Sequence, residues 1–299
     1  MNRRDFVKGA GVVALAAFSP QLVAASEKAT GGARRPLKRG IMWGTVGVKG
    51  SVLEKMKAVK EAGFDGAEMN SHMDQDEVLR ARDATGLAVP SVCGVKHWEK
   101  PLSHPDPKVR EEGLEALRQT LRDAKCYGAS SVLLVPAIVN QEVAYAEAYS
   151  RSQAEIRKAV PLAEELGVKI AIENVWNQFL LSPLEAARYV DEFNSSAVGW
   201  HFDVGNIINY GWPEQWIRVL GKRIQKLHIK EFSRKLRDDQ GLWKGFDVKL
   251  LEGDDNWPAV MKAVDEVAYT GWAITEQGGG DTPEGLHDLL IRLDKILSC

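Results

Sequence analysis

Four residues of types that bind divalent metals each stand at the end of a short hydrophobic run in the second half of the chain. These residues are Glu173, Asp203, His228 and Glu276. Three carboxylates and one imidazole suit a divalent ion such as Mn2+, Mg2+, Co2+ or Zn2+, because the anionic oxygens balance its charge. A single Glu or His in such a place is usually a structural group, but four on successive runs predict one metal centre.

The elements that would bring these residues together follow from a regular alternation of short apolar and longer amphipathic runs after Ala33. The predicted strands are 39–46, 64–70, 88–95, 130–137, 168–175, 198–206, 224–232 and 271–277. The predicted helices are 52–61, 76–85, 108–127, 142–166, 183–193, 214–220, 257–267 and 283–297. The glycines that end helices before the next strand are Gly63, Gly86, Gly128 and Gly167. This rhythm predicts a repeated β–α unit.

We predict an α/β fold with a single (β/α)8 TIM barrel. Eight units without a Gly-x-Gly-x-x-Gly motif after the first strand favour closure over a doubly wound open sheet. The C-terminal ends of barrel strands meet at one mouth, and strand alternation directs Glu173 and His228 into the barrel. Glu276 shares its face with Trp272 and Ile274, so it reaches the mouth only if those side chains fill the interior or the strand end distorts.

The N-terminal part of the chain has the composition of an export signal. Arg3-Arg4 forms a twin-arginine signature ahead of an apolar run from residue 9 to about residue 18. The run is shorter than the ~20 residues of a spanning helix, which favours a signal peptide at 1–25 over a stable membrane anchor. Residues 26–37 are predicted to be a linker and 38–299 the TIM-barrel catalytic domain. The twin-arginine export machinery is then a partner, and the location is periplasmic or otherwise exported.

The charge balance excludes one class of partner. The chain has 41 acidic and 39 basic residues and a formal net charge of -2, so no strong positive field would attract nucleic acid. Residues 233–256 form a long, charged connection, which we expect either to cover the active site or to be a solvated surface excursion. A homo-oligomeric state stays open.

The motifs around the four candidate ligands resemble those of the sugar phosphate isomerase/epimerase-like family of xylose isomerase-type barrels, over nearly all of residues 38–297. The motifs that carry the resemblance are Ile172-Glu173-Asn174-Val175-Trp176-Asn177, Phe202-Asp203-Val204-Gly205-Asn206, His228-Ile229-Lys230-Glu231, and Leu251-Glu252-Gly253-Asp254 followed by Gly271-Trp272 and Glu276. The resemblance implies that Glu173, Asp203, His228 and Glu276 hold a divalent metal, with Mn2+ as the first expectation. It also implies that Glu173 and Glu276 are the catalytic acid and base.

The function implied is a metal-dependent sugar isomerase or epimerase that transfers a proton through a metal-stabilised enediolate. Ketose 3-epimerases of the family usually carry a histidine where this chain has Asn206. The Asp-Val-Gly-Asn sequence instead resembles the pentulose- and hexulose-phosphate branch, although an exported protein meets few phosphosugars. The alternative is a lyase or dehydratase that eliminates a β-substituent from a keto-sugar such as a 3-keto-glycoside or an inosose.

Five further residues are candidates for contacts with a small-molecule sugar substrate. They are Glu68, His97, Trp176, Asn206 and Lys230. A structural salt bridge is an equal alternative for Glu68, and ordinary packing is the alternative for Trp176.

Two other functions would use a similar barrel. An endonuclease-type phosphodiesterase would need more than the six histidines present and a basic face. A non-catalytic sugar-binding protein would have no need for two glutamates on one metal.

Overall fold

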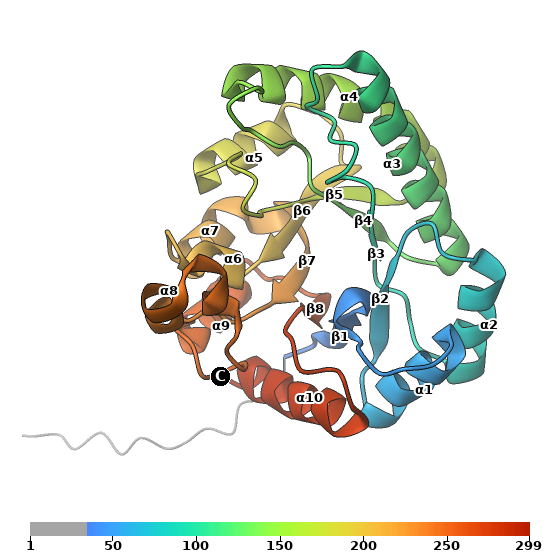
Figure 1. The fold of residues 1–299 in the computed structure, drawn as a ribbon, viewed down its shortest axis with the longest axis vertical. Coiled ribbons are helices and arrows are strands. Elements are labelled where there is room, and N and C mark those ends of the chain that lie inside the picture. Colours follow the sequence, from blue (N-terminus) through green and yellow to red (C-terminus); the bar gives the residue numbers. More distant parts are fainter. Residues whose placement is uncertain (1–34) are drawn as a thin grey trace, which may run out of the picture. The chain divides into compact units, whose positions relative to one another are not determined.

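The computed structural model describes residues 35–299, and the signal peptide predicted at 1–25 and the predicted linker up to residue 34 lie outside this range. Eight parallel strands pair in chain order and β8 pairs with β1, so the sheet closes into a barrel. The strands are β1 (Lys38–Met42), β2 (Gly66–Asn70), β3 (Val92–Cys93), β4 (Ser131–Leu134), β5 (Lys169–Glu173), β6 (Val198–Asp203), β7 (Ile224–Ile229) and β8 (Trp272–Thr275). Figure 1 shows the helices arranged around them. The predicted (β/α)8 TIM barrel is confirmed.

The helices that link the strands correspond to the eight predicted ones, with short additions. The long helices are α1 (Val52–Ala62), α2 (Gln75–Thr85), α3 (Pro107–Tyr127), α4 (Tyr145–Leu166), α5 (Pro183–Asp191), α7 (Pro213–Leu220), α9 (Trp257–Glu266) and α10 (Pro283–Leu297). The additions are α6 (Gly205–Ile208), α8 (Arg234–Gln240) and the 3-10 turns η1 (Trp43–Thr45), η2 (Gly221–Arg223) and η3 (Leu242–Phe246). The glycines predicted to end α1 to α4 all adopt the left-handed conformation there. Among the helices of residues 35–299, none has the length and apolar composition needed to cross a membrane.

Side chains from β8 fill the barrel interior below the mouth. Ile274 lies in register with Gly40 on one side and with His228 on the other. A Cβ atom at Gly40 would lie 2.9 Å from Ile274, and one at Gly66 would lie 2.8 Å from the Trp272 ring, so only glycine leaves room for these side chains. The alternation along β8 therefore continues regularly past Ile274. Glu276, the next residue on this face, was predicted to reach the mouth either because these side chains fill the interior or because the strand end distorts. The structure shows the filled interior.

The connection after β7 is structured. Residues 233–256 contain α8 and η3, and we call this stretch the β7–α9 segment. The buried carboxylate of Glu231, two residues after β7, accepts three hydrogen bonds that fix the segment's C-terminal end. The donors are the backbone N–H of Leu251 (2.6 Å), the backbone N–H of Asp255 (3.0 Å) and the indole Nε1 of Trp257 (2.8 Å). Because a buried carboxylate with several good donors is strongly held, this end of the segment has one position.

A second buried side chain fixes the middle of the β7–α9 segment. Gln277, just after β8, donates from Nε2 to the backbone carbonyl of Phe246 at 3.0 Å and to that of Val248. Its Oε1 accepts from the backbone N–H of Glu231 at 2.8 Å. The amide therefore connects the ends of β7 and β8 to the segment, and it does so directly beside the barrel mouth.

Candidate active site

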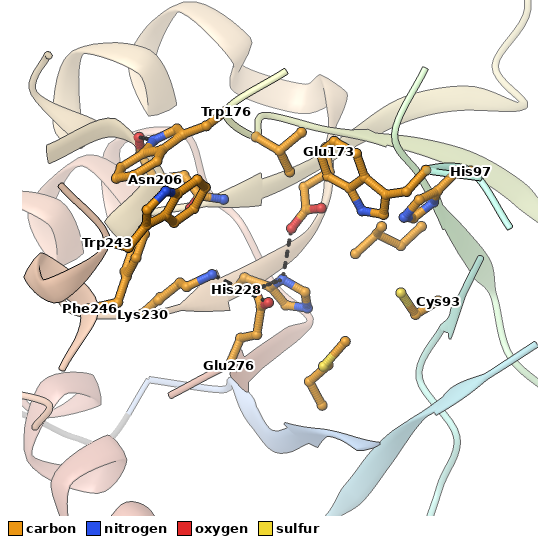
Figure 2. Close-up of a pocket in the computed structure, with 14 residues that line it drawn as sticks. Cys93, His97, Glu173, Trp176, Asn206, His228, Lys230, Trp243, Phe246 and Glu276 are labelled. Atoms are coloured by element: carbon orange, nitrogen blue, oxygen red, sulfur yellow. Dashed lines mark hydrogen bonds and ion pairs between the residues drawn. The ribbon is translucent and has the colours of Figure 1, made fainter. Parts of the chain in front are cut away.

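The four residues predicted to form a metal centre converge at the mouth of the barrel. Glu173 ends β5, Asp203 ends β6, His228 lies in β7 and Glu276 directly follows β8. The Nδ1 atom of His228 lies 3.1 Å from Oε1 of Glu173, 2.9 Å from Oε2 of Glu276 and 3.9 Å from Oδ2 of Asp203. Figure 2 shows Glu173 and Glu276 directed toward the imidazole from different sides. We call these four residues the ligand cluster.

The ligand cluster fits a divalent cation. One ligand atom from each of the four residues lies within 4.8 Å of all the others. Oδ2 of Asp203 is buried and accepts no hydrogen bond from residues 35–299, and the buried Oε2 of Glu276 has only the contact with Nδ1 of His228. Three carboxylates this close repel one another, and leaving such oxygens unpaired in the interior is costly. A bound cation would satisfy both oxygens and balance the charge.

The imidazole of His228 is oriented from below by Glu68. Nε2 of His228 lies 2.7 Å from Oε2 of Glu68, whose other oxygen accepts a hydrogen bond from Ser91. With a cation bound, a carboxylate on Nε2 would fix the neutral tautomer whose Nδ1 lone pair faces the ligand cluster. Burial lowers the pKa of His228, but the charges of Glu68 and Glu276 outweigh it and raise the pKa well above its ordinary value. This corner of the barrel therefore favours positive charge.

The position of Glu68 corrects its predicted contact with a substrate hydroxyl. Glu68 is fully buried beneath His228 and does not line the cavity at the mouth. The salt-bridge alternative describes its place better, with His228 as the partner. The side chain of Ser91 was not predicted, because neither its type nor its spacing distinguishes it from other strand serines.

Lys230 lies beside Glu276 at the mouth. Its Nζ is 3.3 Å from Oε1 of Glu276, 3.7 Å from Oδ2 of Asp203 and 4.7 Å from the centre of the Phe246 ring. Burial lowers the pKa of Lys230, but the neighbouring carboxylates, Glu276 first, outweigh it and raise the pKa above its ordinary value. Burial likewise raises the pKa of Glu276, but Lys230 and His228 outweigh it and hold the pKa below the usual range. For Glu173 the balance is reversed: burial raises its pKa, and His228 and Lys230 offset this only in part.

Asn174 joins the ends of β5 and β6. Its Oδ1 accepts from the backbone N–H of Asp203 at 3.0 Å and from the indole of Trp200 at 3.1 Å, and its Nδ2 donates to the carbonyl of Asp203 at 2.7 Å. The backbone carbonyl of Asn174 accepts from Nδ2 of Asn206 at 3.0 Å. Each of the two side-chain amides is therefore hydrogen-bonded to the backbone at the end of the neighbouring β–α unit. These contacts set the spacing between Glu173 and Asp203. The position of Asn174 beside Glu173 in the sequence does not by itself indicate this role.

A cavity of about 360 Å³ opens above the ligand cluster. It is lined by Met42, Cys93, His97, Trp98, Leu133, Glu173, Val175, Trp176, Asn206, His228, Lys230, Trp243, Phe246 and Glu276. Four of the five predicted substrate contacts, all except Glu68, are therefore at the cavity. Asp203 lies behind this surface with no exposed area.

The β7–α9 segment lines one side of this cavity rather than forming a purely solvated excursion. Trp243 and Phe246 from η3 pack on Trp176, with ring centres 4.9 Å away in each pair. We call these three residues the aromatic wall. In Figure 2 they stand together on the side of Asn206 and Lys230. Neither segment residue was predicted, since nothing in the local pattern indicates which loop side chains turn toward the mouth.

The sequence profile of the family described as "Xylose isomerase-like TIM barrel" matches residues 56–293. The chain belongs to this family. The resemblance noted in the motifs is thereby confirmed at the level of the family.

Several proteins to which the chain is similar are named as sugar epimerases. L-ribulose-5-phosphate 3-epimerase UlaE of Escherichia coli O1:K1 / APEC is 28% identical over 233 residues, which cover 73% of this chain and 79% of that protein. The structure of 3-keto-D-glucoside 4-epimerase YcjR from E. coli superposes with a TM-score of 0.74 at 18% identity, over 88% of this chain and 100% of that one. The IOLI protein with a bound zinc atom also gives a TM-score of 0.74 at 18% identity, over 88% and 98%. At such identities the structures show the shared fold.

Proposed function

We propose that this protein is a metal-dependent sugar isomerase or epimerase. The observation that carries the proposal is the pair of carboxylates from β5 and β8, Glu173 and Glu276, which meet at His228 Nδ1 on the floor of the cavity. Two carboxylates that reach one point from separate strands can act on a bound carbon from different sides. The epimerase names of the similar proteins support the same class of reaction.

The ligand cluster would hold the cation, and Mn2+ is the proposed ion among several that such ligands accept. When bound, a divalent cation would supply Lewis acidity to the carbonyl and hydroxyl oxygens of a sugar. The carboxylates of Glu173, Asp203 and Glu276 would balance the charge, and Glu68 would hold the imidazole of His228 in place.

In this mechanism one glutamate of the pair removes a proton from the carbon next to the carbonyl, and the other returns a proton to the carbon skeleton. Return to the opposite face of the same carbon gives an epimer, and return to the neighbouring carbon gives an isomer. The ammonium group of Lys230, 3.3 Å from Glu276, keeps that carboxylate ionised and can donate to a substrate oxygen.

The test is incubation of Mn2+-loaded protein with a panel of ketoses, phosphosugars and keto-glycosides in D2O. We expect deuterium at carbon with no loss of mass from the sugar skeleton. Release of water or an alcohol would identify the lyase alternative, because elimination breaks a bond at the β carbon. Absence of deuterium uptake from the whole panel would refute the proposed chemistry.

The proposal extends to the N-terminus, where the Arg3-Arg4 motif supports export. We propose cleavage near residue 25, a short linker and delivery of the barrel out of the cytoplasm. Replacement of both arginines by lysine should retain the uncleaved chain in the cytoplasm. A full-length chain found in the cytoplasm before any replacement would contradict export.

A further inference from the structure

The cavity offers little to an anionic substrate. Lys230 is the only lysine or arginine among the cavity-lining residues of the described chain. Its charge is already engaged, because its Nζ lies between Glu276 and Asp203. His97, at the opposite side in Figure 2, accepts a hydrogen bond from the backbone N–H of Val135, and burial lowers its pKa to about 4. It adds no positive charge at neutral pH.

The charges of the ligand cluster likewise leave no free positive charge for an anionic substrate. With a divalent cation on the ligand cluster, His228 would be neutral, and the cation and Lys230 together would balance the three negative charges of Glu173, Asp203 and Glu276. A phosphate dianion in this partly enclosed space would therefore meet no uncompensated cation. Burying such a charge without a partner is strongly unfavourable. The charge inventory favours an uncharged sugar.

The aromatic wall provides a surface that the proton transfer does not require. Trp243 is 68% exposed although its ring packs at 4.9 Å on Trp176, so one side of a large indole faces solvent next to the cavity. Trp98 lines the cavity as well and is 49% exposed. Flat aromatic faces bind the apolar face of a ring by stacking. Gln277 holds the backbone of Phe246, so the wall is pre-formed.

The size of the cavity exceeds that of one sugar ring. At the packing density of protein interiors, a hexose occupies on the order of 200 Å³. The cavity has about 360 Å³, and the largely exposed Trp243 is among its lining residues. With one ring on the ligand cluster, the remaining space would hold part of a second ring, and the rest of that ring would lie outside the cavity against the exposed side of Trp243.

We propose that the substrate is an uncharged keto-sugar carrying a second ring, with its reacting ring above Glu173 and Glu276 and its second ring stacked on Trp243 and Trp176. This inference rests on the proposed function and specifies its substrate class. It differs from the phosphosugar suggested by the name of the similar E. coli protein.

Matched sugars test the inference. Series built on fructose, psicose, ribulose and xylulose each compare the neutral ketose, its phosphate ester and the ketose bearing a glucosyl group, with deuterium uptake in D2O as the readout. Within a reactive series we expect the glucosylated ketose to have the highest kcat/KM and the phosphate the lowest, about tenfold or more below the neutral ketose. Preference for the phosphate would overturn the inference alone. No uptake in any series would refute the proposed function, and the inference with it.

A pair of tryptophan variants locates the second ring. Trp243→Ala should lower kcat/KM for the glucosylated ketose about tenfold through KM and leave the neutral ketose within about twofold, as expected for loss of one stacking contact. Trp212→Ala is the matched control, because Trp212 is 58% exposed but does not line the cavity. Equal effects of Trp243→Ala on both sugars, or no effect on either, would overturn the assignment of the aromatic wall.

Discussion

The ligand cluster and the aromatic wall bound the same cavity but are built differently. The ligand cluster comes from the ends of four strands and is held from below, where Glu68 contacts His228 at 2.7 Å. The aromatic wall comes mainly from η3 in the β7–α9 segment and is held by hydrogen bonds from Gln277 to backbone carbonyls. The cluster therefore depends on the barrel itself, whereas the wall depends on a connection attached to it. This difference separates the residues that we propose perform the chemistry from those that we propose select the substrate.

The largest effect is expected in the ligand cluster. Glu173→Gln and Glu276→Gln should each lower turnover by about a thousandfold or more, because each removes a proton-transferring carboxylate. Deuterium uptake and product formation measure the loss, and Glu142→Gln on the exposed surface is the control. Full activity in both variants would contradict the assignment of acid and base.

A smaller effect on the ligand cluster is expected when Glu68, which holds His228 from below, is replaced. Glu68→Gln should weaken divalent-cation binding about 10- to 100-fold, since partners that orient a metal-binding histidine typically contribute this much. Calorimetric titration with Mn2+ measures the change. Ser91→Ala, which removes only the hydroxyl that donates to Glu68, should give a weaker loss in the same direction. Unchanged affinity in Glu68→Gln would show that His228 needs no support from below.

Loss of the Glu231 contacts that hold the β7–α9 segment, from which most of the aromatic wall comes, should lower the stability of the protein. Glu231→Gln places an amide N–H where Glu231 now only accepts three hydrogen bonds, so the free energy of unfolding should fall by about 1.5 kcal/mol. For a domain of this size that corresponds to a melting temperature about 3–6 °C lower. Differential scanning calorimetry measures it, with the exposed Glu252→Gln as control. An unchanged melting temperature would show that the β7–α9 segment is not held by Glu231.

The smallest effect concerns His97, on the side of the cavity opposite the wall. Because burial lowers its folded-state pKa to about 4, the unfolded chain binds a proton there at higher pH than the folded chain does. Stability should fall as the pH drops from about 6.5 toward 4, by up to about 2 kcal/mol between pH 7 and pH 5 for a fully buried group. Because the imidazole of His97 is partly exposed, His97→Gln should reduce the fall by about 1 kcal/mol. Denaturant unfolding at pH 7 and pH 5 measures the difference. Equal pH dependence in both proteins would contradict the shift.

The strands and helices were predictable from sequence because their signals are local. Hydrophobic alternation and the glycines that end α1 to α4 recur with each β–α unit, so the barrel follows from repetition. Convergence of the ligand cluster follows in turn, since a barrel brings its strand ends to one mouth. A salt bridge of Glu68 was among the predictions, but its partner was not predictable, because the contact with His228 crosses the barrel between residues 160 positions apart.

The amino-acid sequence by itself determined the barrel, the meeting of four possible metal ligands at its mouth and the family to which the chain belongs. Only the tertiary structure decided that Ile274 and Trp272 fill the interior opposite Gly40 and Gly66, and that Glu276 therefore reaches the mouth. It also decided which side chains of the β7–α9 segment line the cavity. The physical reason is that strand ends are placed by a repeated backbone pattern, whereas the aromatic wall is placed by individual hydrogen bonds between distant residues.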